Sequence, residues 1–385
     1  MKTFDFIVVG GGTSGTVTTE KLVSQGHSVL LLEEGHKNRN PFLSMPAGWL
    51  TLLDGSPYLK FYKSTPQAQL NNRQHDIAQA KILGGGSSVN AMVYMRGKPS
   101  DYENWVKKTS DHRWGWESLL QNYKRLEGNQ RLSGDFHGKD GPIKVSDPGY
   151  VAKGSKLYIE AMQNLGLPYN DDFNDGDQYG VGLMQYTIGD LKRSDTVSTL
   201  IEPLINNKNI TIHLNSIVTK VIIENKKAVG VEVVNKGKVE NFYGKEIILT
   251  AGSLVSPKIL MHSGIGDEIQ LNKYGIKVIQ KLPGVGKNLQ DHHEVPFISR
   301  AKQGYGYFKQ DKGLRKIKNG IQYLLFKSGP VASTGVDCCS FLNPENILDK
   351  NNPTVKLYCV QIMYTDRDTK GIDPDHGVTL TPCIM

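Results

Sequence analysis

The sequence contains little cysteine and no long apolar run. Its four cysteines, Cys338, Cys339, Cys359 and Cys383, all lie near the end of the chain, without a C-x-x-C pair or the spacing of metal ligands. This pattern favours reduced, buried thiols and gives no support to a metal site. No apolar run reaches transmembrane length, and the first apolar strand begins by Phe4, which leaves no room for a cleavable signal. The sequence therefore predicts a cytoplasmic protein.

Acidic residues are fewer than basic ones, but the excess is scattered. The net charge is +8, and it comes mainly from dispersed lysines, so it predicts no nucleic-acid site. With 385 residues, of which 38% are hydrophobic, the chain is long enough for two domains and a large core.

A glycine-rich stretch near the N-terminus has the pattern of a βαβ unit. Residues 6–9 predict a strand, residues 13–25 a helix ended by Gly26, and residues 28–32 a second strand that leads into Glu33. Gly10, Gly12 and Gly15 fill the G-x-G-x-x-G spacing between the first strand and the helix. In such a turn the backbone approaches a pyrophosphate, the helix N-terminus presents N-H donors, and the acid accepts from a ribose hydroxyl. The stretch predicts an adenine dinucleotide site, with FAD and NAD both open.

The remaining elements are less distinct. Residues 36–79 show no sustained period and predict a long crossing segment. Helices are predicted at 114–127, at 155–165 and, as a short one, at 196–204, and Asn170 to Asp177 is an acidic loop without the spacing of an EF-hand. Residues 210–214, 217–224, 228–235 and 239–243 predict an antiparallel meander, followed by a buried strand at 245–250. Ser256 and Pro257 predict the start of a helix that ends before Gly264.

Two further motifs make the sequence resemble the glucose-methanol-choline oxidoreductase family. Residues 80–97, AKILGGGSSVNAMVYMRG, resemble the family's first signature, and residues 252–266, GSLVSPKILMHSGIG, match its second signature. The stretches 101–105, 114–127, 136–145 and 282–296 are also similar to the family, so the resemblance covers nearly the whole chain.

The resemblance implies FAD rather than NAD as the cofactor. In similar proteins the glycine-rich turn holds the pyrophosphate, and the acid after the second strand holds the adenosine ribose. The position of Val218 gives a backbone contact to the adenine, Ala251 and Gly252 lie beside the same half of the cofactor, and the first signature touches the pyrophosphate and the flavin. Covalent attachment in some relatives uses a histidine of the first signature, and Val89 is in the corresponding neighbourhood here, which predicts non-covalent FAD. The positions carried over as cofactor-binding are Gly10, Gly12, Thr13, Ser14, Gly15, Glu33, Ile82, Gly84, Asn90, Ala91, Met92, Val93, Val218, Ala251 and Gly252.

The resemblance also implies the fold class. We expect an α/β, Rossmann-like FAD-binding domain with a parallel sheet, formed by residues 1–150 and 194–296 and carrying the β-meander at 210–243. Residues 151–193 and 297–385 are expected to form an α+β substrate domain on an antiparallel sheet, incomplete at its C-terminus. Within it, residues 321–326 predict a short helix, and residues 336–341, 354–363 and 378–383 predict strands. The last strand is expected to leave unpaired edge groups.

The activity implied by the resemblance is oxidation of the CH-OH group of a primary alcohol, as in choline dehydrogenases, with hydride transfer to flavin N5. The electron acceptor, oxygen or a quinone, stays open. The expected catalytic histidine has no counterpart before Met385, and His262, His292, His293 and His376 favour surface or core roles over base catalysis. The catalytic residue is therefore unknown, and an inactive FAD-binding fragment is the alternative. Light-driven decarboxylation of fatty acids, known for a branch of similar proteins, is a minor third reading.

A basic and aromatic stretch, residues 302–318, has two readings. It favours a solvated helix face beside a loop, and peripheral contact with a membrane is the alternative.

Overall fold

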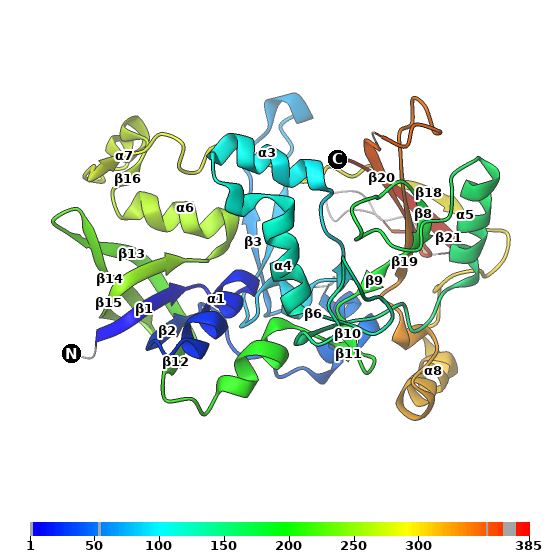
Figure 1. The fold of residues 1–385 in the computed structure, drawn as a ribbon, viewed down its shortest axis with the longest axis horizontal. Helices are drawn as coiled ribbons and strands as arrows, with labels where there is room; N and C mark the ends of the chain where they lie inside the picture. Colours follow the sequence, from blue (N-terminus) through cyan, green and yellow to red (C-terminus); the bar gives the residue numbers. More distant parts are fainter. Residues whose placement is uncertain (1–2, 53–54, 352, 365–374) are drawn as a thin grey trace. The chain divides into compact units, whose positions relative to one another are not determined.

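The computed structural model describes residues 3–52, 55–351, 353–364 and 375–385. By their contacts these residues fall into two compact units (Figure 1). The first contains 1–40, 52–89 and 195–291, and the second contains 41–51, 90–194 and 292–385. Residues 41–51 and 90–150 thus lie in the second unit, whereas the predicted FAD-binding domain included them. The assignment of cofactor and substrate roles to the ranges stays a prediction.

The first unit is built on a six-stranded sheet with the strand order β12-β2-β1-β15-β14-β13. The four neighbouring strands β12, β2, β1 and β15 run parallel to one another. Strands β14 and β13 continue the sheet beyond β15 and pair antiparallel. Its main elements are β1 (Thr3–Val9), α1 (Thr13–Ser24), β2 (Val29–Leu32), β12 (Ile210–His213), β13 (Ser216–Glu224), β14 (Lys227–Asn235), β15 (Lys238–Leu249) and α6 (Gly252–His262). The predicted βαβ unit is confirmed.

Both faces of this sheet are covered. Val255 and Ile259 of α6 pack on one face, and Leu22 and Val23 of α1 pack on the other. Burial on both faces explains why β2 reads as an unbroken apolar run, since all four of its residues are buried. The unit also contains β3 (Leu59–Lys63), β4 (Asp76–Ala80), α2 (Gly86–Val89), a π-helix (Val197–Ile201), a 3-10 helix (Glu202–Leu204), β16 (Ile265–Gly266), α7 (Glu268–Lys273) and β17 (Gln280–Lys281).

Four details of this unit differ from the sequence predictions. β12 pairs in parallel with β2 and is not part of the meander, because alternation reveals a strand but not its partner. The two strands predicted at 239–243 and 245–250 form the single strand β15, since Gly244 stays paired to Phe4. Helix α6 begins at Gly252, directly after the strand, so Pro257 lies inside the helix. The crossing segment 36–79 contains the antiparallel pair β3 and β4.

The second unit is built on a five-stranded antiparallel sheet with the order β18-β21-β20-β19-β8. Helix α5 (Lys153–Asn164) lies along one face of the sheet, where Ile159 and Met162 are buried (Figure 1). The strands are β8 (Gly180–Leu183), β18 (Phe297–Arg300), β19 (Val336–Leu342), β20 (Val355–Val360) and β21 (Gly377–Ile384). The expected edge at the last strand is wrong, because β21 lies between β18 and β20 and is paired on both sides.

The rest of the second unit consists of helices and short strand pairs. They are α3 (Pro99–Thr109), α4 (Trp116–Leu126), α8 (Gly313–Phe326), β5 (Val93–Tyr94), β6 (Glu127–Asn129), β7 (Ile143–Val145), β9 (Gln185–Tyr186), β10 (Ile188–Gly189), β11 (Lys192–Arg193) and short 3-10 helices at Pro41–Ser44, His112–Trp114 and Pro330–Ala332.

Helix α8 is longer than the predicted residues 321–326. The basic residues of 302–318 are exposed, as a solvated face requires, but α8 also exposes apolar side chains, among them Leu314 at 84% and Leu325 at 70%. In the part of the chain that the structure describes, no helix has both the length and the apolar character needed to cross a membrane.

Candidate functional site

The glycine-rich turn between β1 and α1 leaves no room for side chains at two positions. A Cβ on Gly15 would lie 1.9 Å from the carbonyl oxygen of Gly10, and a Cβ on Gly10 would lie 2.6 Å from the carbonyl oxygen of Thr250. Gly10 also has a positive φ of 102°, which favours glycine. These contacts bring the start of α1 against the end of β15.

The N-terminus of α1 is open to a ligand. Its N-cap, Gly12, offers no side chain to the first backbone N-H groups, Thr13 and Ser14 are exposed, and the first turn carries no acid. A Cβ on Gly12 would meet nothing closer than the Cα of Gly85 at 3.8 Å. N-H donors and the positive end of the helix dipole therefore face open space, which fits a pyrophosphate.

Glu33 lies at the end of β2 with its side chain turned toward this turn. Its two carboxylate oxygens each accept a backbone N-H, from Gly11 and from Gly35, both at 2.8 Å. The side chain is buried, and burial raises the pKa of Glu33 to about 7, although the two N-H donors oppose the shift. Each oxygen keeps a second lone pair, so Glu33 can still accept from a ribose hydroxyl.

The first signature packs against the same turn. The backbone N-H of Gly84 donates to the carbonyl oxygen of Gly11 at 2.7 Å, and Ile82 is fully buried. Gly84 and Gly85 both have positive φ, and a Cβ on Gly85 would lie 2.7 Å from the Cα of Gly12. The structure thus brings Ile82 and Gly84 beside the predicted pyrophosphate residues.

The second signature begins where β15 ends. Thr250 donates its hydroxyl to the carbonyl oxygen of Gly10 at 2.8 Å, which ties Ala251 and Gly252 to the glycine-rich turn. Gly252 is exposed and has a φ of 83°. A Cβ added there would meet no atom closer than the side-chain oxygen of Gln79, at 3.8 Å. Val218, on β13, is followed by a β-bulge, a feature that leaves backbone groups unpaired. The sequence analysis missed Thr250, although a threonine at the end of a buried strand is a usable signal.

The remaining predicted residues, Asn90 to Val93, lie in the second unit. Met92 is fully buried and has a positive φ of 63°, which is uncommon for a residue with a side chain and marks a constrained position. Its carbonyl oxygen accepts from the N-H of Thr187, and Val93 pairs with Tyr186. Ala91, between Asn90 and Met92 in the sequence, is half-buried.

Arg193 holds this segment in place and was missed by the sequence analysis. Its guanidinium donates to the side-chain and the backbone oxygen of Asn90, both at 2.8 Å, and to the carbonyl oxygen of Leu43 at 2.8 Å. The sequence gives no signal for this role, because the partners are far apart along the chain.

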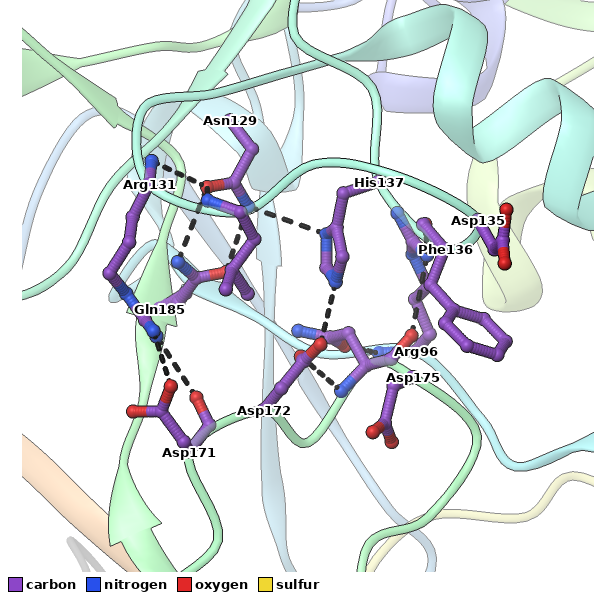
Figure 2. A network of polar contacts seen from close by, with 12 residues as sticks. Arg96, Asn129, Arg131, Asp135, Phe136, His137, Asp171, Asp172, Asp175 and Gln185 are labelled. Atoms are coloured by element: carbon purple, nitrogen blue, oxygen red, sulfur yellow. Dashed lines mark hydrogen bonds and ion pairs between the residues drawn. The ribbon is translucent and has the colours of Figure 1, made fainter.

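The second unit also contains a buried ionic network. Glu127 accepts from Arg96 at 2.8 Å and contacts the imidazole of His137 at 2.9 Å, and the other imidazole nitrogen lies 2.8 Å from Asp172. Figure 2 shows the ring of His137 linked to Asp172 on one side and to Asn129 on the other. Burial opposes charge on the ring, but the carboxylates of Asp172 and Glu127 raise the pKa of His137 to about 9.

Asp172 belongs to the acidic loop at 170–177. The predicted loop is confirmed, but this carboxylate is largely buried against His137 rather than solvated. Among the residues that the structure describes, no cluster of acids, histidines or cysteines is arranged to hold a metal.

Protonated His137 should make stability depend on pH. The folded pKa of about 9 lies above the ordinary value of 6.5, so the contribution is complete below pH 6.5 and is lost as pH rises through about 9. We expect denaturant unfolding to show a larger loss of stability between pH 6 and pH 10 in the wild type than in His137→Gln. The exposed His112→Gln should behave like the wild type, and identical pH profiles for His137→Gln and the wild type would contradict the assignment.

Fold and site together define a dinucleotide-binding protein with an attached antiparallel sheet. The family model for GMC oxidoreductases matches residues 4–294, so the chain belongs to this family. Solved relatives include an FAD-dependent oxidoreductase, and FAD is confirmed as the expected cofactor. The fold class predicted from the sequence is likewise confirmed.

Curated relatives are similar over most of this chain. It is 34% identical over 345 residues to the oxygen-dependent choline dehydrogenase of Photobacterium profundum, covering 88% of this chain and 60% of that protein. The oxygen-dependent choline dehydrogenase of Rhizobium etli (strain CIAT 652) is 34% identical, with 97% and 67% covered. An alcohol dehydrogenase [acceptor] of Pseudomonas putida is 33% identical, with 99% and 69% covered. The chain thus spans 60 to 69% of the length of these relatives.

Solved structures show the same fold. Pyridoxine 4-oxidase from Mesorbium loti has a TM-score of 0.88 and 28% identity, and the match covers 99% of this chain and 71% of that one. A formate oxidase has a TM-score of 0.87 and 25% identity, with 100% and 73% covered.

Proposed function

We propose that the chain provides the FAD site of an oxidoreductase that acts on the CH-OH group of a primary alcohol. The observation that supports this most is the convergence of the open N-terminus of α1, the first signature and the start of α6 on one glycine-rich turn. Similarity to proteins named choline dehydrogenase and alcohol dehydrogenase supports the reaction class.

The proposed roles combine what the resemblance to the family implies with the contacts described above. The backbone of Gly10 and of Gly12 to Gly15 binds the pyrophosphate, Glu33 accepts from the ribose, and the backbone at Val218 contacts the adenine. Ala251 and Gly252 lie beside the same, adenosine half of the cofactor, and Ile82 and Gly84 touch the pyrophosphate and the flavin. Asn90 to Val93 contact the flavin, and Arg193 orients them through Asn90.

Bound FAD supplies a hydride acceptor at flavin N5. The chain's task is to orient the cofactor and the alcohol and to keep water from the reacting atoms. The hydroxyl proton needs a base, which typically contributes about 100 to 10,000-fold in rate. None of the four histidines weighed from the sequence is assigned to this role. The electron acceptor stays open between oxygen and a quinone, and a cytoplasmic location and peripheral membrane contact stay predictions.

Two measurements on the purified chain test the proposal. We expect acid precipitation to release all the flavin into the supernatant, because Val89 stands where a covalent histidine would be. Anaerobic addition of a substrate alcohol should bleach the visible absorbance of the bound flavin. Flavin that stays on the denatured chain would contradict non-covalent binding. Bound flavin that no primary alcohol reduces would favour the alternative, an FAD-binding fragment without turnover.

A further inference from the structure

One buried lysine has no assigned role in this scheme. Lys356 lies on β20 and is 7% exposed. Its ammonium group lies 4.3 Å from the centre of the Tyr358 ring and 5.3 Å from the centre of the Phe341 ring. Within residues 3–52, 55–351, 353–364 and 375–385, no carboxylate forms an ion pair with it. Aromatic faces attract a cation, but they do not replace an anion.

The surroundings of Lys356 disfavour its charge. Burial lowers its pKa, and the thiols of Cys339 and Cys383 and the carboxylate of Glu294 oppose this only in part. Cys339 lies on β19, Cys383 on β21, and Glu294 is bridged to Cys383. A buried ammonium without a counterion is costly, so a structural lysine at this place would be expected to carry a carboxylate partner.

The two rings beside Lys356 connect it to the proposed flavin segment. Phe341 belongs to a buried cluster that includes Met92, and Tyr358 and Val93 pack against the same cluster. Lys356, Phe341 and Cys339 occupy this face of the sheet, whereas Cys338 and Cys359 face α5 on the other side. The ammonium group thus lies beside the layer that carries Met92 and Val93, all within the second unit.

We propose that Lys356 binds an anionic group of the substrate, which makes the substrate an alcohol that also carries a carboxylate or a phosphate. This inference rests on the proposed oxidation of an alcohol and specifies its substrate class. An anion would supply the direct ion pair that Glu294 does not form with Lys356, and the phenol of Tyr358, whose pKa is raised by burial, stays protonated and can donate a second hydrogen bond. Lys356 is then a specificity residue and takes no part in proton or hydride transfer.

The same charge argues against choline as the substrate. Choline carries a quaternary ammonium, and bringing it beside a second buried cation adds repulsion in a poorly screened environment. The named activity of the choline dehydrogenase relatives is therefore not expected of this site.

The test compares ligands that differ only in charge. The full chain, reconstituted with FAD, is titrated by calorimetry with para-(hydroxymethyl)benzoate, its neutral amide and its trimethylammonium analogue. Glycolate, glycolamide and choline are a second series of smaller ligands, to be used if the site is too narrow for a benzene ring. The phosphate ester of para-(hydroxymethyl)phenol shows whether a phosphate binds better than the carboxylate.

We expect the anionic ligand to bind about 10 to 100-fold more tightly than the amide, and the cationic one not to bind. Lys356→Met should remove this preference by lowering affinity for the anionic ligand far more than for the amide, whereas Lys356→Arg should retain part of the preference. Lys350→Met, which changes an exposed lysine, is the matched control. The wild type offers a second measurement. When the anionic ligand binds at alkaline pH, the protein should take up protons, because the anion raises the pKa of Lys356. Two buffers with different heats of ionisation measure this uptake without any variant.

The outcomes separate the two proposals. Equal affinity for charged and neutral ligands, no binding of any anionic ligand, or an anion preference that survives in Lys356→Met would overturn the assignment of Lys356. Flavin binding and reduction by a neutral alcohol could still succeed in that case. Failure of the chain to bind FAD would instead overturn the proposed function, and the anion titrations of the chain would still report on Lys356.

Discussion

Replacing Gly15 by alanine should abolish FAD retention and destabilise the first unit. The new Cβ would lie 1.9 Å from the carbonyl oxygen of Gly10 and 2.8 Å from the hydroxyl of Thr250. The first of these atoms belongs to the backbone, so no side-chain rotation relieves the overlap, and α1 must move away from β1. We expect a loss of about 3 kcal/mol in the free energy of unfolding, at the upper end for overpacking. Denaturant unfolding and a fluorescence titration with FAD measure the two effects.

Gly284→Ala is the control for this substitution. A Cβ at Gly284 would meet nothing within 4 Å, and Gly284 lies in the same unit. It should therefore keep wild-type stability and FAD affinity. A Gly15→Ala protein that binds FAD as the wild type does would show that the glycine-rich turn is not the pyrophosphate site.

Replacing Arg96 by methionine should cost about 3 to 5 kcal/mol of stability, because it leaves the carboxylate of Glu127 buried without its guanidinium partner. The two side chains are 1% and 0% exposed and lie 2.8 Å apart. Arg96 also donates to the carbonyl oxygen of Phe136, so the loop before His137 loses a second contact. Denaturant unfolding of the purified variants measures the loss.

Arg131→Met provides the comparison. Arg131 pairs with Asp147 and Asp171, but its side chain is 36% exposed, and such pairs contribute about 0 to 1 kcal/mol. The double variant Arg96→Met with Glu127→Gln should recover part of the loss, since the uncompensated charge is then removed. Equal, small losses for Arg96→Met and Arg131→Met would contradict the role of the buried network.

Local patterns in the sequence predicted the elements that depend on neighbouring residues. The βαβ unit follows from an apolar run, three spaced glycines and the acid Glu33, which are all close in sequence. The same reasoning could not find that β12 pairs with β2, because the pattern of a strand does not encode its neighbour. It placed the start of α6 too late, since Pro257 resembles a first helical residue wherever it occurs.

The parts of the candidate site that were missed all depend on distant contacts. Arg193 meets Asn90 across about a hundred residues of sequence, and His137 meets Glu127 and Asp172 from separate segments. Lys356 lies in a predicted strand, and only the packing against Phe341 and Tyr358 reveals that its side chain is buried. Sequence patterns indicate which residues are polar, but the tertiary fold decides which of them meet.

The four cysteines lie in one unit only. All are buried, at 3% exposure or less, and all belong to residues 292–385, so the first unit contains no thiol. A thiol reagent therefore reacts only when the second unit opens, and the rate of labelling measures the opening of that unit alone. If loss of FAD loosens the first unit by itself, flavin fluorescence will change while the labelling rate stays constant. The four cysteines therefore distinguish the opening of the second unit, which labels them, from the opening of the first unit, which does not.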